Sequence, residues 1–163
     1  MQRITPCLWF DSEAEEAANF YTSIFKNSKI GRILRYGEAE YEIHGKPAGS
    51  VLTVEFELDG QSFTALNGGP IFKFNEAISL QFDCETQEEV DYYWEKLSEG
   101  GDKNAQHCGW LKDKFGLSWQ VVPTIVGELL SDKNAKKSER VMSALHQMKK
   151  LDIATLKRAY EEG

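Results

Sequence analysis

Several residue types and patterns are scarce in this chain, and each scarcity excludes a class of protein. The 163 residues include 4 prolines and 13 glycines, too few for a collagen-like or low-complexity segment. The 3 cysteines cannot all pair with one another, so they indicate reduced thiols rather than a disulfide scaffold. No apolar run approaches the ~20 residues of a membrane span, and the amino-terminal residues lack the layout of a signal peptide. We expect a cytoplasmic globular protein without a membrane partner.

Basic residues are scarce in the larger part of the chain. Residues 1–123 hold 11 Lys and Arg against 20 Asp and Glu, a net charge of −9, whereas residues 124–163 hold 8 against 6, or +2. Nucleic-acid binding draws most of its affinity from clustered basic side chains that neutralise phosphates. The sequence therefore predicts no nucleic-acid partner.

A strand pattern occurs twice, 74 residues apart. Apolar residues alternate with others over residues 4–10 and again over residues 78–84, as in strands with two unlike faces. At this offset Ile4 corresponds to Ile78. The recurrence predicts a first strand in each of two similar units.

Each predicted strand is followed by a predicted amphipathic helix. Two capping boxes mark the helix starts, Ser12 with Glu15 and Thr86 with Glu89. Apolar side chains then recur at helical spacing. The two apolar stripes are Ala14, Ala17, Ala18, Tyr21, Ile24 and Phe25, and Val90, Tyr93, Trp94 and Leu97. Because strand, cap, helix and offset all recur, we interpret the pattern as a duplicated unit.

A β-hairpin is predicted in the first copy. Asp59-Gly60 is the signature of a two-residue turn, and it pairs Phe56 with Phe63 and Val54 with Ala65. The predicted strands of both copies cover residues 29–36, 51–58, 61–67, 105–108, 110–112 and 116–122, with a loop over residues 37–49 and a turn near Asp113-Lys114.

Beyond Pro123 the pattern becomes helical. Apolar residues recur at helical spacing from Ile125 to Leu130, from Val141 to Met148 and from Ile153 to Tyr160. We predict a helical extension over residues 124–163, packed either on its own domain or on a second copy of the chain. The preceding domain, residues 1–123, would comprise modules of about 1–72 and 73–123.

Three motifs give the chain a family resemblance. They are Ala14-Glu15-Glu16-Ala17 with Phe20-Tyr21, Leu66-Asn67-Gly68-Gly69-Pro70, and the string that runs from Cys108-Gly109-Trp110 through Trp119-Gln120 to Pro123. With the duplicated unit, they make the chain resemble the PhnB-like branch of the glyoxalase-bleomycin resistance (vicinal oxygen chelate) superfamily, whose members are often labelled as a 3-demethylubiquinone-9 3-methyltransferase domain. The resemblance implies an α+β fold in which two βαβββ modules form a curved eight-stranded sheet around a cleft, in a homodimer.

The resemblance also implies where a metal would bind. In metal-using relatives, inward side chains of the first, fourth, fifth and eighth strands ligate a divalent ion. The corresponding positions here are Thr5, a residue within 65–67, Ser79 and Gln120. Divalent sites prefer imidazole, carboxylate or thiolate ligands, so we expect neither a metal in the cleft nor another cofactor.

The methyltransferase label gains no support from the sequence. A methyl donor such as S-adenosylmethionine usually binds behind a glycine-rich strand-to-helix turn, which neither predicted helix start contains. Asn67-Gly68-Gly69-Pro70 follows a hairpin strand and is typical of a chain reversal.

The histidines do not predict a catalytic pair. His44 lies in a predicted loop, and His146 is expected on the solvated side of a helix. Adjacent residues of a strand point to opposite faces, so His107 and Cys108 should not form a Cys–His pair.

Polar and aromatic residues on the strand faces away from the helices are the candidate cleft lining. The predicted ligand-binding residues are Thr5, Trp9, Glu55, Asn67, Ser79, Gln81, Trp110 and Gln120. Aromatic surface with a few neutral polar groups suits a small organic ligand; alternatively, Trp9 and Trp110 only fill the mouth of the barrel. Glu55 is a candidate base if it is enclosed and an ordinary solvated carboxylate if it is not.

Two functions remain open from the sequence. The first is a module that binds or sequesters a small organic ligand in a metal-free cleft. The second is a superfamily enzyme of unknown substrate, whether lyase, isomerase, dioxygenase or the methyltransferase of the family label.

Overall fold

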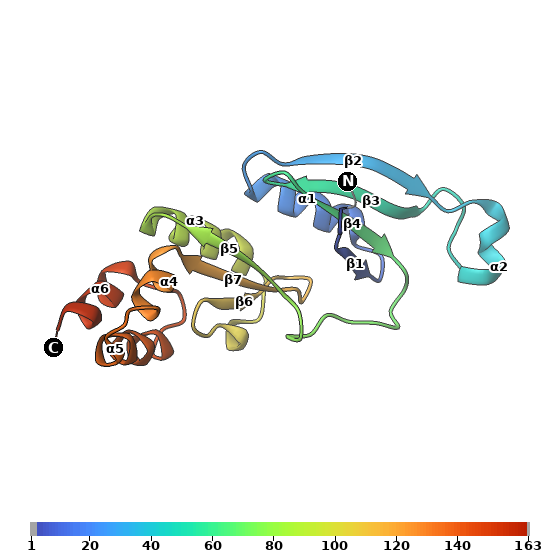
Figure 1. Cartoon of the computed structure of the whole chain (residues 1–163). Helices are drawn as coiled ribbons and strands as arrows, with labels where there is room; N and C mark the ends of the chain where they lie inside the picture. The colour runs from blue at the N-terminus through green and yellow to red at the C-terminus, as the bar shows by residue number, and fades with distance from the viewer. Residues whose placement is uncertain (1–2, 163) are drawn as a thin grey trace. The chain divides into compact units, whose positions relative to one another are not determined.

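Two compact units make up the chain in the computed structural model, Met1–Phe74 and Asn75–Gly163 (Figure 1). The structure describes residues 3–162. Within that range no helix combines the length and the apolar character that crossing a membrane requires.

The first unit is a four-stranded sheet covered by one helix. Its elements are β1 (Cys7–Phe10), α1 (Ala14–Ile24), β2 (Lys29–Arg35), η1 (Glu38–Glu40), α2 (Tyr41–His44), β3 (Val51–Leu58) and β4 (Gln61–Asn67). The strand order is β1-β4-β3-β2, in which β1 and β4 are parallel and the other pairs antiparallel. The predicted stripe of α1 packs on β3 and β4, where Tyr21 is fully buried.

The predicted hairpin is confirmed in register. Phe56 pairs with Phe63 and Val54 pairs with Ala65. The turn is tight because Asp59 and Gly60 both adopt positive φ, at 46° and 80°, as the favoured two-residue hairpin turn requires. Residues 37–49, predicted as a loop, contain the short helices η1 and α2.

The second unit is a smaller sheet followed by three helices. Its elements are β5 (Ser79–Cys84), α3 (Gln87–Ser98), η2 (Lys103–Ala105), β6 (Trp110–Lys112), β7 (Ser118–Pro123), α4 (Ile125–Leu130), α5 (Ala135–His146) and α6 (Ile153–Glu161). The strand order is β5-β7-β6, and β5 is parallel to β7 as β1 is to β4. The arrangement of strand, covering helix and parallel closing strand thus recurs, as the sequence repeat predicts.

Residues 3–162 form seven strands in two sheets, where the sequence predicts eight strands in one. The predicted strand over residues 105–108 is wrong. Cys108 and Gly109 have φ of 51° and 84°, so the chain turns there and only a single bridge joins His107 to Trp110. Upstream, η2 takes up residues 103–105 because the Asp102 side chain accepts a 2.9 Å hydrogen bond from the Asn104 N–H.

The first capping box is also wrong, whereas the second is confirmed. α1 begins at Ala14, and no side chain within the Ser12–Glu15 box caps it. The cap comes instead from β4, where Asn67 Oδ1 accepts a 2.8 Å hydrogen bond from Ala14 N–H. At α3, the Thr86 hydroxyl accepts from Glu89 N–H, as predicted. A side chain 53 residues away in the sequence, and not a neighbouring one, thus caps α1.

Both predicted first strands begin later than the alternation suggests. β1 starts at Cys7 and β5 at Ser79, and Ile4 and Ile78 lie outside them. Their side chains are 94% and 62% exposed.

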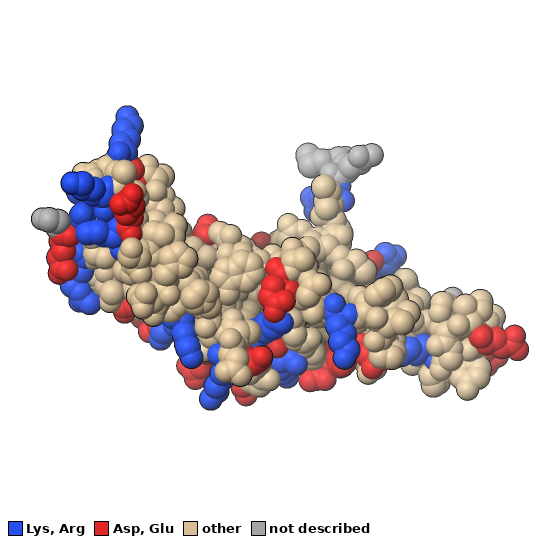
Figure 2. Space-filling model, turned by 90° about the horizontal axis from the view of Figure 1, so that it is seen from below, with Lys and Arg blue, Asp and Glu red and all other residues tan. Residues whose placement is uncertain are grey.

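The three C-terminal helices share an apolar core within the second unit. The buried members are Val126, Leu129, Val141, Leu151 and Leu156. The side-chain amide of Gln87 in α3 holds the start of α6. It donates to Leu151 O at 3.1 Å and accepts from Ile153 N–H at 2.8 Å. Figure 2 shows Lys and Arg side chains, with Asp and Glu among them, gathered over the end of the chain that carries α5 and α6.

Replacing Trp94 should test the second helical stripe. Trp94 lies on the buried face of α3 and is 9% exposed, so Trp94→Ala should lower the free energy of unfolding by roughly 3–5 kcal/mol. Tyr92→Ala is the matched control, because Tyr92 lies on the same helix and is 41% exposed. Urea denaturation of both variants measures the difference, and equal losses would contradict the assigned burial.

Candidate functional site

The open face of the second sheet brings four of the predicted ligand-binding residues together. Gln81, Gln120 and Trp110 lie opposite one another across β5, β7 and β6. Side chains paired in register share a face of the sheet. Gln120 Nε2 donates a 2.9 Å hydrogen bond to Ser79 Oγ on the same face. The alternate residues of β7, such as Trp119, are buried on the other face, which α3 covers.

Three more of the predicted ligand-binding residues, Thr5, Trp9 and Glu55, belong to the open face of the first sheet. Cys7 pairs with Thr64, which pairs with Glu55, and Trp9 is two residues further along β1. Thr5 precedes β1 and is exposed, but it lines a cavity of about 320 Å³ together with Glu55 and Thr64. Apart from Asn67, the predicted polar and aromatic residues of each sheet therefore lie on the face away from its helix.

Glu55 is not enclosed. Its carboxylate forms an ion pair with Arg32, with Nη2 and Oε1 2.6 Å apart, and its side chain is 44% exposed. The solvated alternative is the one that fits, because a general base needs an unpaired carboxylate close to the substrate proton.

Asn67 lies on the helix-covered face. It pairs with Phe10, and β4 instead turns Ser62, Thr64 and Leu66 to the open face. Its Oδ1 caps α1, and its Nδ2 donates to Val51 O at 3.1 Å. Both ends of the amide are therefore bound within the protein, and a direct ligand contact by Asn67 stays a prediction.

The Asn67-Gly68-Gly69 motif holds Trp9 in place. Trp9 Nε1 donates a 2.9 Å hydrogen bond to Gly69 O. A Cβ on Gly68 would lie 2.1 Å from the Trp9 ring, so only glycine allows the indole to pack on this backbone. Phe72 meets the ring edge-on, with centroids 4.9 Å apart. The motif thus places an aromatic surface at the edge of the open face.

The motif of residues 108–123 also has a structural role, which centres on Asp113. Asp113 is 2% exposed, and its Oδ1 accepts from Phe115 N–H at 2.8 Å and from Leu117 N–H at 3.1 Å. Its Oδ2 accepts from Trp119 Nε1 at 2.8 Å. Gly116 completes the turn with φ of 86°. These contacts fix β6 against β7 and so align Trp110 with Gln120.

Cys108 contacts two histidines, which the sequence does not predict. Its Sγ lies 3.3 Å from His107 Nε2 and 3.7 Å from His146 Nδ1. The expectation that His107 and Cys108 point apart is wrong, because the positive φ of Cys108 replaces the strand by a turn. Burial raises the pKa of the Cys108 thiol, which keeps it protonated and disfavours a nucleophilic role.

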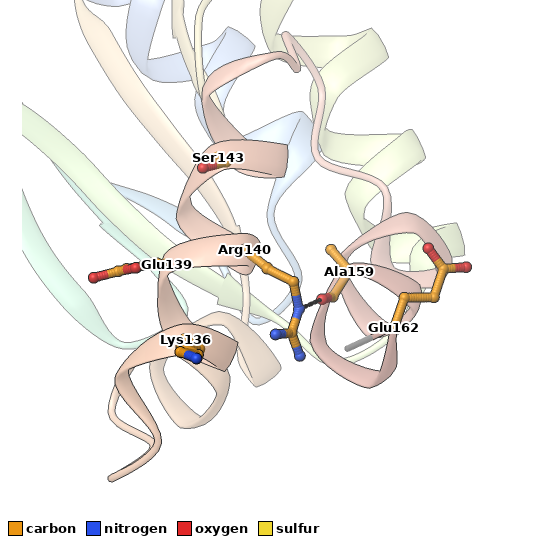
Figure 3. A pocket seen from close by; sticks show the side chains of 6 residues that line it. All are labelled: Lys136, Glu139, Arg140, Ser143, Ala159 and Glu162. Atoms are coloured by element: carbon orange, nitrogen blue, oxygen red, sulfur yellow. Dashed lines mark hydrogen bonds between the residues drawn. The ribbon is translucent and has the colours of Figure 1, made fainter.

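A groove of about 580 Å³ lies between α5 and α6 (Figure 3). Arg140 crosses it and donates to Ala159 O and Tyr160 O, both at 2.9 Å. A cation bound to the last carbonyls of a helix stabilises that helix end. Arg140 therefore joins the two helices across the groove.

Comparison with known proteins identifies the family. The family described as 3-demethylubiquinone-9 3-methyltransferase matches residues 2–122. A solved PhnB protein from Bacillus cereus, which carries the same description, is 38% identical over 76% of this chain and 100% of its own, with a TM-score of 0.65. The chain belongs to this PhnB-like family.

More distant structures share the fold of this PhnB-like chain. Protein PA1353 from Pseudomonas aeruginosa is 18% identical over 76% of this chain and 98% of its own, with a TM-score of 0.57. The fosfomycin resistance protein FosX from Listeria monocytogenes is 17% identical over 80% of this chain and 98% of its own, with a TM-score of 0.52. No curated protein matches the chain.

The superfamily metal does not fit the open faces of this PhnB-like protein. Three of the corresponding positions carry hydroxyls or an amide, Thr5, Ser79 and Gln120, and within residues 65–67 of β4 the open-face residue is Leu66, which has no ligand atom. Gln120 Nε2 is hydrogen-bonded to Ser79 Oγ. Such neutral oxygens are weak ligands beside imidazole or carboxylate, so these residues do not form the superfamily's divalent site.

Gly68→Ala should displace Trp9. The added methyl group must push the indole off the backbone, which should cost roughly 1–3 kcal/mol of stability and change the near-ultraviolet circular dichroism. Gly37→Ala is the matched control, because a Cβ there meets nothing within 4 Å. If both variants unfold at the same urea concentration and keep the wild-type spectrum, the packing of Trp9 on Gly68 is incorrect.

Asp113→Asn should separate the two functions of this carboxylate. Asparagine keeps an acceptor for the two backbone N–H groups but presents an NH₂ group to Trp119 Nε1–H. We expect a loss of roughly 1–3 kcal/mol for the unsatisfied buried donor. Asp83→Asn, at an exposed position of β5, should unfold as the wild type does. Chemical denaturation measures both.

Proposed function

We propose that this PhnB-like protein binds a small organic molecule in a metal-free cleft, with the open face of the second sheet as its principal lining. The observation that carries the proposal is the group on the second sheet, where Ser79, Gln81 and Gln120 lie beside Trp110. Neutral hydrogen-bonding groups beside an indole suit a ligand with an unsaturated ring or chain and uncharged polar atoms.

The first sheet supplies a second aromatic surface. Trp9 is half-buried and held by Gly69, and Phe72 beside it is 62% exposed. Stacking on such a surface stabilises a planar ligand without demanding charge. In this proposal Thr5 and Glu55 contribute polar contacts, and Asn67 acts indirectly by fixing the end of β4.

An enzyme of the superfamily is the second candidate. The family description and the resistance role printed for FosX favour it. The ion pair of Glu55 counts against an enzyme. Glu55 is the carboxylate among the predicted ligand-binding residues, and it is paired with Arg32. Thr5, Ser79 and Gln120, at three of the positions that correspond to the superfamily's metal ligands, carry only hydroxyls and an amide.

We also propose that two copies associate. None of the described residues of α2 is buried, and Tyr41 and Ile43 are 57% and 75% exposed. Exposed apolar surface of this kind marks sites of protein association. Light scattering after size exclusion measures the mass in solution. Wild type should have the mass of two chains, and Ile43→Glu should shift it toward the mass of one.

A thermal-shift screen tests ligand binding. The panel contains aromatic, quinone and phosphonate compounds. A ligand at 100 times its Kd adds about 2.7 kcal/mol, which raises Tm by roughly 5–10 °C for a chain of this size. A compound that gives this shift should lose at least tenfold affinity on Gln120→Ala. Gln61→Ala, at the exposed start of β4, is the control that should keep it.

The same compound separates the two candidates. Recovery of the compound unchanged after incubation, by mass spectrometry, supports a binding module. Its conversion would favour the enzyme. A hit whose affinity is the same in Gln120→Ala and in Gln61→Ala would overturn the proposed site.

A further inference from the structure

We propose that His107, Cys108 and His146 bind one zinc ion, outside the residues proposed for the organic ligand. The three ligand atoms, one from each residue, lie within 4.8 Å of one another. Within residues 3–162 no other group of three His, Cys, Asp or Glu side chains is brought together in this way. The proposal does not depend on the proposed ligand-binding function.

The distances already approach those of a tetrahedral zinc site. Zinc bonds of about 2.3 Å to sulfur and 2.1 Å to nitrogen place sulfur and nitrogen about 3.6 Å apart. Cys108 Sγ lies 3.3 Å from His107 Nε2 and 3.7 Å from His146 Nδ1. Both histidines are exposed, so their rings can rotate and bring the two nitrogens closer without disturbing the core.

Backbone hydrogen bonds hold the two sides of the site together without the metal. Cys108 N–H donates to Met148 O at 2.9 Å, and Gly109 N–H donates to Lys149 O at 2.8 Å. His146 ends α5 just before these acceptors. Gly109 permits the close approach, since a Cβ there would lie 3.1 Å from Leu151 Cδ1, in the segment that follows these acceptors. The ligands are therefore positioned by contacts that are independent of the ion.

Cys108 occupies a backbone conformation that its side chain does not favour. With Gly109 it forms the central pair of a two-residue turn between His107 and Trp110, at φ of 51°. Glycine, asparagine or aspartate usually takes such a position. A thiol here points at two imidazoles instead.

The donor set selects the metal. One thiolate and two neutral imidazoles suit zinc, whereas magnesium and calcium prefer oxygen ligands. The thiol gives its proton to solvent on binding, so the site carries a net charge of +1 with zinc. Three protein ligands leave the fourth position for a water molecule.

The site joins two parts of the sequence that differ in family membership. His107 and Cys108 lie within the family match, which ends at residue 122, and His146 lies in the helical extension beyond it. A bound zinc would therefore crosslink the extension to the turn before β6. We expect zinc to raise Tm and magnesium to leave it unchanged.

Zinc titration of the full-length chain tests the proposal. After chelator treatment, zinc is added in competition with a chromophoric chelator, and one equivalent per chain should bind. Loss of a second-shell partner weakens metal sites by roughly 10–100-fold, so removal of a ligand should cost at least about 100-fold. The variants are Cys108→Ser and His146→Gln, and the controls are Cys7→Ser and His44→Gln, which alter exposed residues of the first unit.

Cobalt substitution reports the thiolate directly. Cobalt bound to wild type should show a sulfur-to-metal charge-transfer band that is absent in Cys108→Ser, and zinc should slow alkylation of Cys108 in the Cys7→Ser background. Circular dichroism verifies that each variant is folded. The proposal is overturned if wild type binds no zinc, or if Cys108→Ser and His146→Gln bind it as tightly as the controls do.

Discussion

Each sheet of this protein has a single helix to bury one of its faces, and the rest of the structure follows from that constraint. α1 covers the first sheet and α3 the second, so apolar side chains concentrate on those faces. A sheet with one covered face must carry residues that tolerate solvent or a ligand on the other. The open faces accordingly present hydroxyls, amides and indoles, such as Ser79, Gln120 and Trp110. Burial and candidate function thus have the same origin.

The motifs that carry the family resemblance act mainly through geometry. Asn67 caps a helix from 53 residues away and ties it to β3, and Gly68 admits the ring of Trp9. Asp113 satisfies three donors in one buried turn. Buried polar groups of this kind are costly to alter, because each lost partner leaves a donor or acceptor unsatisfied. A specific motif therefore identifies the fold, and the chemistry must be sought in the side chains that the motif positions.

Sequence patterns predict what depends on local periodicity and fail where distant segments decide. The register of Phe56 with Phe63 and the cap at Thr86 follow from short patterns, and both are confirmed. The start of α1 does not, because its cap is Asn67 on β4. Strand parity places Gln81, Gln120 and Trp110 on one face, as the register shows. Parity fails at Cys108, where two positive φ angles replace the expected strand by a turn.

The cluster at Cys108 also changes how metal analysis of this protein must be interpreted. The open faces carry neutral oxygen donors at the positions of the superfamily metal, whereas His107, Cys108 and His146 offer a thiol and two imidazoles elsewhere in the second unit. One zinc per chain would therefore not argue for a metal in the cleft. Only the ligand variants separate the two locations, because a cleft ion would survive the loss of Cys108 and an ion at the turn would not. The absence of metal from the cleft and the presence of zinc at the turn are therefore independent properties, and an experiment can contradict either one without affecting the other.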